Sequence, residues 1–148
     1  MVKFSIQTLN VWFEKYQALK NITIDVKTDE ILSIIGPSNS GKTTFLRMLN
    51  RMNELNLHCS MKGRVEFQGT DLMSMDVEQV RKRVGMVFAL PLPLPLSIFD
   101  TVIYGVRMHD RVKKNLLEEI VEKSLKQASL WEEVKDRLHT SAFKLSGG

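Results

Sequence analysis

Residues 31–49 read ILSIIGPSNSGKTTFLRML, and this stretch decides the fold class of the chain. Its first five residues are apolar apart from one serine, which is typical of a short strand buried in a parallel sheet. The glycines and the proline of GPSNSG then end the strand. From Lys42 to Met52 the pattern indicates a helix, because Phe45, Leu46 and Leu49 would share one side. The stretch therefore predicts a strand, a glycine-rich loop and a helix in succession, as in an α/β fold.

The loop between this strand and helix matches the phosphate-binding pattern G-x-x-x-x-G-K-[ST] from Gly36 to Thr43. Backbone N–H groups can surround a bulky anion only where no Cβ obstructs the approach, and glycine at both ends of the loop meets this condition. The helix that begins near Gly41 adds further N–H donors and the positive end of its dipole. Lys42 would place its cation against the β- and γ-phosphates, and the Thr43 hydroxyl would be a ligand for Mg²⁺. The sequence therefore predicts an ATP site with Mg²⁺ as cofactor.

The rest of the chain divides into a β-rich part and a helical part. We expect strands at Phe4–Phe13, Ile22–Val26, Gly63–Gln68 and Val84–Phe88, the last of them buried, and a turn at Gly69–Asp71. We expect helices at Val77–Lys82, Ile98–Arg107, Lys113–Ser129 and Trp131–Leu138. Prolines 91, 93 and 95 exclude a helix there and indicate an extended loop.

The composition is ordinary for one globular domain. The chain has 148 residues, of which 43% are apolar and 26% are charged, and no apolar run approaches the roughly 20 residues that a membrane helix needs. Cys59 is the only cysteine, which fits a reducing cytosol. The net charge is +4 and the pI is about 9.3, but the basic residues are scattered. A nucleic-acid partner is therefore supported by the pI alone, and we expect none.

The chain resembles the nucleotide-binding domains of ABC transporters from about Thr8 to Gly148. The second strong element after the loop is the terminal LSGG at Leu145–Gly148, which stands at the distance of the family's signature motif. The flanking segments are similar to those in the ATP-binding subunits of bacterial phosphate importers. These segments are Ala18–Ile22, Val84–Phe88, Ser97–Asp100, Tyr104–Arg107 and Leu130–Asp136.

The resemblance implies a P-loop NTPase (RecA-like) core with an antiparallel β subdomain and an α-helical subdomain, truncated in this chain. Residues 1–148 would be a single, incomplete nucleotide-binding domain. Residues 1–35 and 63–70 would form the antiparallel region, residues 31–52 and 84–88 the core, and residues 98–148 the helical subdomain. The implied partners are transmembrane permease subunits and, in the complete form, a second copy of the chain. The implied location is the cytoplasmic face of the plasma membrane.

The resemblance also implies roles for particular residues. Tyr16 stands where the family places an aromatic ring that stacks on adenine, and the alternative is that it packs in the core beside Trp12 and Phe13. The implied nucleotide site comprises Tyr16, Gly36, Pro37, Ser38, Asn39, Ser40, Gly41, Lys42, Thr43 and Thr44, with Thr43 also a ligand of Mg²⁺. The implied contacts with ATP bound to the opposite subunit come from Leu145, Ser146, Gly147 and Gly148.

The sequence departs from the family in two places. Ala89 stands where the family has a glutamine that reaches Mg²⁺, the attacking water and the membrane partner, and alanine has no polar side-chain atom for these contacts. The family's hydrolytic residues follow the signature motif, so we assign no catalytic residue here. Without the strands of that region, Ile31–Ile35 would have an unpaired apolar edge. Two hypotheses follow: the N-terminal part of an importer ATPase, or a truncated or pseudo module that binds ATP without turnover.

Overall fold

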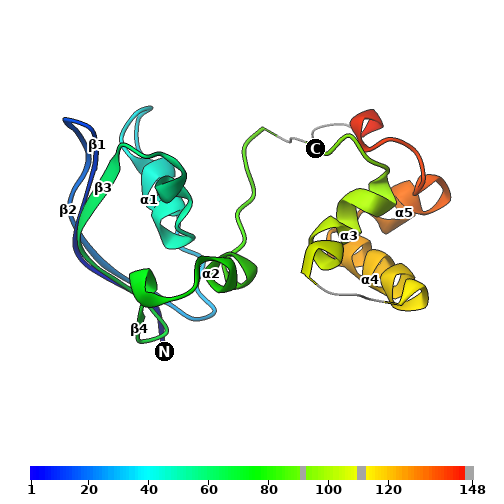
Figure 1. Cartoon of the computed structure of the whole chain (residues 1–148), viewed down its shortest axis with the longest axis horizontal. Coiled ribbons are helices and arrows are strands. Elements are labelled where there is room, and N and C mark those ends of the chain that lie inside the picture. The colour runs from blue at the N-terminus through cyan, green and yellow to red at the C-terminus, as the bar shows by residue number, and fades with distance from the viewer. Residues whose placement is uncertain (91–92, 110–112, 146–148) are drawn as a thin grey trace. The chain divides into compact units, whose positions relative to one another are not determined.

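The computed structural model describes residues 1–90, 93–109 and 113–145 (Figure 1). The chain divides into two compact units, Met1–Val87 and Phe88–Gly148, and each has its own apolar cluster. The first unit holds the strands and two of the α-helices. The second unit is helical.

The first unit is built on a four-stranded antiparallel sheet in the order β2-β1-β3-β4. Its strands are β1 (Val2–Phe13), β2 (Tyr16–Lys27), β3 (Cys59–Phe67) and β4 (Thr70–Asp71). In the β1–β2 hairpin Ile6 faces Ile24 and Val11 faces Leu19, and on the other side of β1 Ile6 faces Val65. The strands expected at Phe4–Phe13, Ile22–Val26 and Gly63–Gln68 are thereby confirmed. The turn expected at Gly69–Asp71 is wrong in part, because Thr70 and Asp71 pair with β3.

Helix α1 (Lys42–Leu49) packs against this sheet through Phe45 and Met48, which are buried in the same cluster as the core residues of β1, β2 and β3 (Figure 1). The helix is shorter than the expected Lys42–Met52, because Arg51 has a left-handed backbone with φ 59° and ends the regular hydrogen bonding. A 3₁₀ turn, η1 (Met52–Leu55), follows. The predicted apolar side is also partly wrong, since Leu46 is 45% exposed.

After β3 and β4 the chain forms a second 3₁₀ turn, η2 (Leu72–Ser74), and then helix α2 (Val77–Arg83), which was expected at Val77–Lys82. Asp76 caps α2, because its carboxylate accepts a hydrogen bond of 3.0 Å from the Gln79 N–H. Leu72 and Val80 are fully buried in the cluster under the sheet. These contacts hold the η2–α2 segment against the sheet of the first unit.

Two expected strands are absent among the described residues. Neither Ile31–Ile35 nor Val84–Phe88 joins the sheet, and Ile31, Ile35 and Val87 are 97%, 92% and 99% exposed. A parallel strand forms only beside hydrogen-bonded neighbours, and every pair of the described sheet is antiparallel. The apolar pattern of these segments is typical of a buried strand, but the described residues do not bury them. The apolar edge predicted at residues 31–35 is therefore exposed, although it is not a strand.

The second unit consists of α3 (Ile98–His109), α4 (Lys114–Gln127), α5 (Trp131–Val134) and the 3₁₀ turns η3 (Lys135–Arg137) and η4 (Ala142–Lys144). α3 and α4 agree with the helices expected from the sequence within two residues at each end, whereas the helix expected at Trp131–Leu138 is α-helical only to Val134 and continues as η3. Helix α4 presents one apolar face to the apolar cluster of this unit, with Leu117, Val121 and Leu125 buried beside Ile103 and Val134, whereas Leu116 is 48% exposed. Across the described ranges, every helix is too short or too polar to cross a membrane.

Candidate functional site

A pocket of about 480 Å³ lies between the β1–β2 hairpin and the beginning of α1. Its lining residues are Phe13, Tyr16, Ala18, Asn39, Ser40, Gly41, Lys42, Thr43 and Thr44. Of the residues expected to bind nucleotide, the pocket therefore brings Tyr16 together with residues 39–44. Gly36 and Pro37 line an adjoining groove that shares Ser40, Gly41 and Lys42, whereas Ser38 lines neither space. Phe13 and Ala18 were missed, and only the hairpin register could have indicated them.

Gly41 sets how closely the loop approaches strand β2. Its backbone is left-handed with φ 86°, and it stands directly before the first residue of α1. A Cβ at this position would lie 2.6 Å from the Ala18 carbonyl oxygen and 2.7 Å from Leu19 Cδ2. Only glycine fits both the conformation and the space. The start of α1 is thereby held against the strand that begins with Tyr16.

The Lys42 side chain folds back over the loop. Its ammonium donates hydrogen bonds to the carbonyl oxygens of Gly36, at 2.8 Å, and Pro37, at 2.6 Å, and lies 3.3 Å from Ser40 Oγ. In the described part of the chain no carboxylate forms an ion pair with Lys42. A cation held only by neutral oxygens attracts an anion that enters the pocket.

The first turn of α1 offers backbone donors to the same pocket. No side chain caps the helix at Gly41, and no acidic residue stands in the first turn. The first intrahelical bond runs from the Phe45 N–H to the Gly41 carbonyl oxygen, at 2.9 Å. The N–H groups before Phe45 have no partner within the helix, so they and the helix dipole favour a negative charge there. The hydroxyl of Thr43 belongs to an exposed residue of this turn.

Tyr16 follows the two-residue turn of the hairpin and pairs with Phe13. It is 62% exposed, so the alternative that it packs in the core is wrong. The hairpin holds its backbone in register while the ring stays accessible beside the loop. An accessible ring at the edge of a phosphate-binding loop is a platform on which a planar base can stack.

The other residues singled out from the sequence lie in the second unit. Ala89 is exposed and outside any helix or strand, and the loop expected from the proline pattern includes residues 91 and 92, which lie outside the described ranges. Leu145 packs against the apolar cluster of the second unit. Ser146, Gly147 and Gly148 lie outside the described residues. In the described ranges no group of three or more histidine, cysteine or acidic residues could hold a metal ion.

Similarity to known proteins identifies the family of the chain. The family model described as ABC transporter matches residues 19–148. The phosphate import ATP-binding proteins PstB 2 of two Streptococcus thermophilus strains, CNRZ 1066 and ATCC BAA-250 / LMG 18311, are each 49% identical to the chain over 146 residues. The match covers 97% of this chain and 58% of each relative, so the chain spans less than two thirds of their length. The match confirms the expected resemblance, and the chain belongs to the ABC transporter family.

Proposed function

We propose that this chain binds ATP with Mg²⁺ in the pocket between the β1–β2 hairpin and α1, as the ATP-binding part of an ABC importer for inorganic phosphate. One observation carries the proposal: an exposed aromatic ring, Tyr16, lines the same pocket as the uncapped first turn of α1 and Lys42. Triphosphate and base have different chemistry, and the pocket offers a matching surface for each.

The triphosphate would lie along residues Gly36–Thr44. The N–H groups of the first turn of α1 would bind its oxygens, and Lys42 would exchange the carbonyl oxygens of Gly36 and Pro37 for phosphate oxygens. This exchange replaces neutral acceptors with charged ones, so it favours the bound state. Gly41 permits the approach, because any larger residue would force the loop away from β2.

The adenine ring would stack on Tyr16, with Phe13 and Ala18 as further lining residues. Stacking of a base on an aromatic side chain contributes roughly 1–3 kcal/mol per base in nucleic-acid complexes. Such stacking tolerates different bases, so the pocket supports binding of a nucleotide without selecting adenine over other bases.

Mg²⁺ fits this site only together with the nucleotide. Thr43 supplies one hydroxyl ligand, and the described residues hold no cluster that could bind a metal ion alone. Mg²⁺ commonly keeps several waters and binds through one or two protein oxygens plus substrate phosphates. When bound, it would neutralise charge on the β- and γ-phosphates.

The finer features of the family follow by inference. We infer a domain with a RecA-like core at residues 31–52 and 84–88, an antiparallel region at residues 1–35 and 63–70, and a helical subdomain at residues 98–148. We also infer partners that are permease subunits and a second copy of the chain. The relatives' printed name, phosphate import ATP-binding protein, supports the solute and the transport role. Placement at the cytoplasmic face of the membrane, and contacts of Leu145, Ser146, Gly147 and Gly148 with ATP on the opposite subunit, belong to the same inference.

A second candidate, ATP binding without turnover, is favoured by Ala89, whose methyl group cannot orient a water molecule.

The test is titration of the 148-residue chain with a fluorescent ATP analogue in the presence of Mg²⁺, with phosphate release followed in the same sample. Lys42→Ala should abolish saturable binding, whereas Lys62→Ala, which removes an exposed lysine of β3 outside the pocket, should leave it unchanged. Equal binding by the two variants would contradict the proposed site. Phosphate release by the parent chain would exclude the candidate without turnover.

A further inference from the structure

The turn after α1 has a backbone that its residue does not favour. Arg51 adopts φ 59° and ψ 26°, a left-handed conformation that is uncommon outside glycine, asparagine and aspartate. A glycine would form the same turn without strain. Such a conformation in another residue persists where the surroundings hold it in place, so the contacts of the Arg51 side chain need an explanation.

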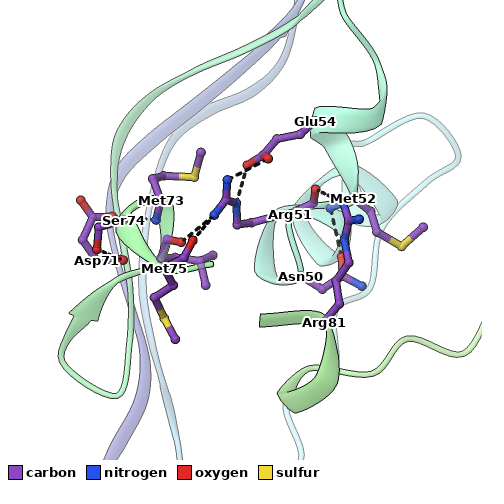
Figure 2. A network of polar contacts seen from close by, with 10 residues as sticks. Asn50, Arg51, Met52, Glu54, Asp71, Met73, Ser74, Met75 and Arg81 are labelled. Atoms are coloured by element: carbon purple, nitrogen blue, oxygen red, sulfur yellow. Dashed lines mark hydrogen bonds and ion pairs between the residues drawn. The ribbon is translucent and has the colours of Figure 1, made fainter. Parts of the chain in front are cut away.

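Those contacts join three segments that are distant in the sequence (Figure 2). The guanidinium binds the Glu54 carboxylate through Nε at 2.6 Å and Nη2 at 2.9 Å. Its Nη1 donates to the Met75 carbonyl oxygen at 2.6 Å and lies 3.5 Å from that of Leu72. In return, the Arg81 guanidinium donates to the Arg51 carbonyl oxygen at 3.1 Å. We call Arg51, Glu54, Leu72, Met75 and Arg81 the Arg51 network.

Within the Arg51 network the Arg51 side chain and Leu72 are shielded from water, whereas Glu54 and Arg81 are exposed. The Arg51 side chain is only 13% exposed, which strengthens its hydrogen bonds relative to those of a surface arginine. The hydrogen bond to Glu54 raises the pKa of Arg51 above its ordinary value, so the group stays charged. The planar guanidinium bonds a carboxylate and a carbonyl in fixed directions at once, which a lysine could not do. The network therefore fixes both the position and the direction of the turn after α1.

That turn is followed by η1, which places a buried side chain, Asn53, against the first turn of α1. Asn53 in η1 is 4% exposed, and its amide donates a hydrogen bond of 2.8 Å to the Thr44 carbonyl oxygen. Thr44 belongs to the first turn of α1 and lines the pocket. Because α1 has only eight residues, its direction depends on such tertiary contacts. Arg51 is thus joined through the chain to Asn53, and Asn53 is hydrogen-bonded to the first turn of α1, whose residues line the pocket.

We propose that Arg51 is a positioning residue for the nucleotide site: it fixes the turn that holds Asn53 against Thr44, and so sets the direction of the phosphate-binding turn of α1. This inference rests on the proposed nucleotide-binding function. The inference concerns binding of the phosphate groups and not of the base. In the described part of the chain, Tyr16 and the hairpin that carries it have no hydrogen bond to the Arg51 network. The two ends of the ligand therefore give separate readouts.

The test compares two fluorescent probes, an ATP analogue and the adenosine that carries the same fluorophore. Arg51→Gly keeps the left-handed turn and removes the side chain. We expect it to weaken binding of the ATP analogue on the order of tenfold, because the loss of one hydrogen bond to a charged group has an effect of this size or larger. Binding of the adenosine analogue should stay within about twofold, since general destabilisation would weaken both probes alike.

Three further variants complete the test. Arg51→Lys should recover only part of the loss, because it keeps the charge and loses the fork. The double variant of Arg51→Gly and Asn53→Ala should bind the ATP analogue as tightly as the more weakly binding of the two single variants, since both substitutions act through one set of contacts. Ser129→Gly relieves another left-handed residue, at φ 58° in the second unit, and should change neither affinity.

The outcomes separate this inference from the function on which it rests. Unchanged affinity of Arg51→Gly for the ATP analogue, or an equal loss for both probes, would overturn the positioning role while leaving ATP binding intact. If the parent chain bound neither probe, the proposed function would fail and the positioning role with it. Should Arg51→Gly not fold, Arg51→Lys carries the same comparison, and an unaltered ratio of the two affinities would refute the role.

Discussion

Replacing Gly41 with alanine tests whether the close approach of the loop to β2 is a real constraint. The new Cβ would lie 2.6 Å from the Ala18 carbonyl oxygen and 2.7 Å from Leu19 Cδ2, and φ is 86°. Gly69 gives a matched control, because its φ is 80° and a Cβ there would meet nothing within 4 Å. The two substitutions therefore share the conformational strain and differ in the steric clash.

The expected magnitudes follow from these two contributions. A left-handed backbone costs a residue with a Cβ about 1–2 kcal/mol, and this is the whole effect expected for Gly69→Ala. Forcing extra volume into a packed place typically adds about 1–3 kcal/mol, so Gly41→Ala should destabilise by about 2–5 kcal/mol. Because folded domains are stable by only about 5–15 kcal/mol, this difference is readily measured.

The assay is urea unfolding followed by the fluorescence of Trp12, in a Trp131→Phe background that leaves Trp12 as the single tryptophan. Trp12 lies in β1 and reports on the unit that contains the loop. Gly41→Ala should also weaken binding of the ATP analogue, whereas Gly69→Ala should leave that binding unchanged. Equal destabilisation by the two variants would refute the steric reasoning, and intact nucleotide binding by Gly41→Ala would refute the role of the close approach.

Three further predictions concern single side chains. Tyr16→Ala should lower the affinity for the ATP analogue by about 5- to 150-fold, the equivalent of 1–3 kcal/mol, whereas Tyr16→Phe should leave it unchanged. Fluorescence titration of both variants measures this. The Ser97 hydroxyl, assisted by Arg107 and opposed by burial, lowers the pKa of Asp100 from 3.8. The resulting stabilisation is present above that value and is lost as the pH falls through the lower folded value, so the unfolding free energies of the parent and Asp100→Asn should converge in acid. Leu125→Ala should destabilise the second unit by about 2–5 kcal/mol in urea unfolding monitored by Trp131, because the side chain is 5% exposed.

The sequence was sufficient for the elements that are stabilised by nearby residues. β1 and α4 show their periodicity directly, and β1 has its hairpin partner β2 directly after it in the chain. It was misleading at Ile31–Ile35 and Val84–Phe88, where a buried strand was expected. A pattern of apolar residues predicts the environment that a segment prefers, while hydrogen-bonded neighbours decide whether a strand forms. Those neighbours are not among the described residues.

The site was predicted in the same uneven way. The loop motif named Lys42 and Thr43 because phosphate chemistry restricts the residue types at fixed spacing. The family resemblance named Tyr16, and its exposure agrees with that interpretation. Nothing in the sequence indicated the Arg51 network, because its hydrogen bonds join residues 51, 72, 75 and 81, and no local pattern encodes such contacts.

The hairpin turn at Glu14 and Lys15 has a consequence for how the chain folds. Side chains alternate between the two faces of a strand, so a slip of one residue in the β1–β2 pairing would turn Tyr16 to the opposite face. The same slip would move Ala18 and Leu19 away from the place where the chain approaches Gly41 closely. Correct pairing of the hairpin must therefore precede completion of the loop. Nucleotide binding during refolding should appear as a late signal, after the hairpin has formed, on a timescale longer than the roughly 1–10 μs of an isolated hairpin.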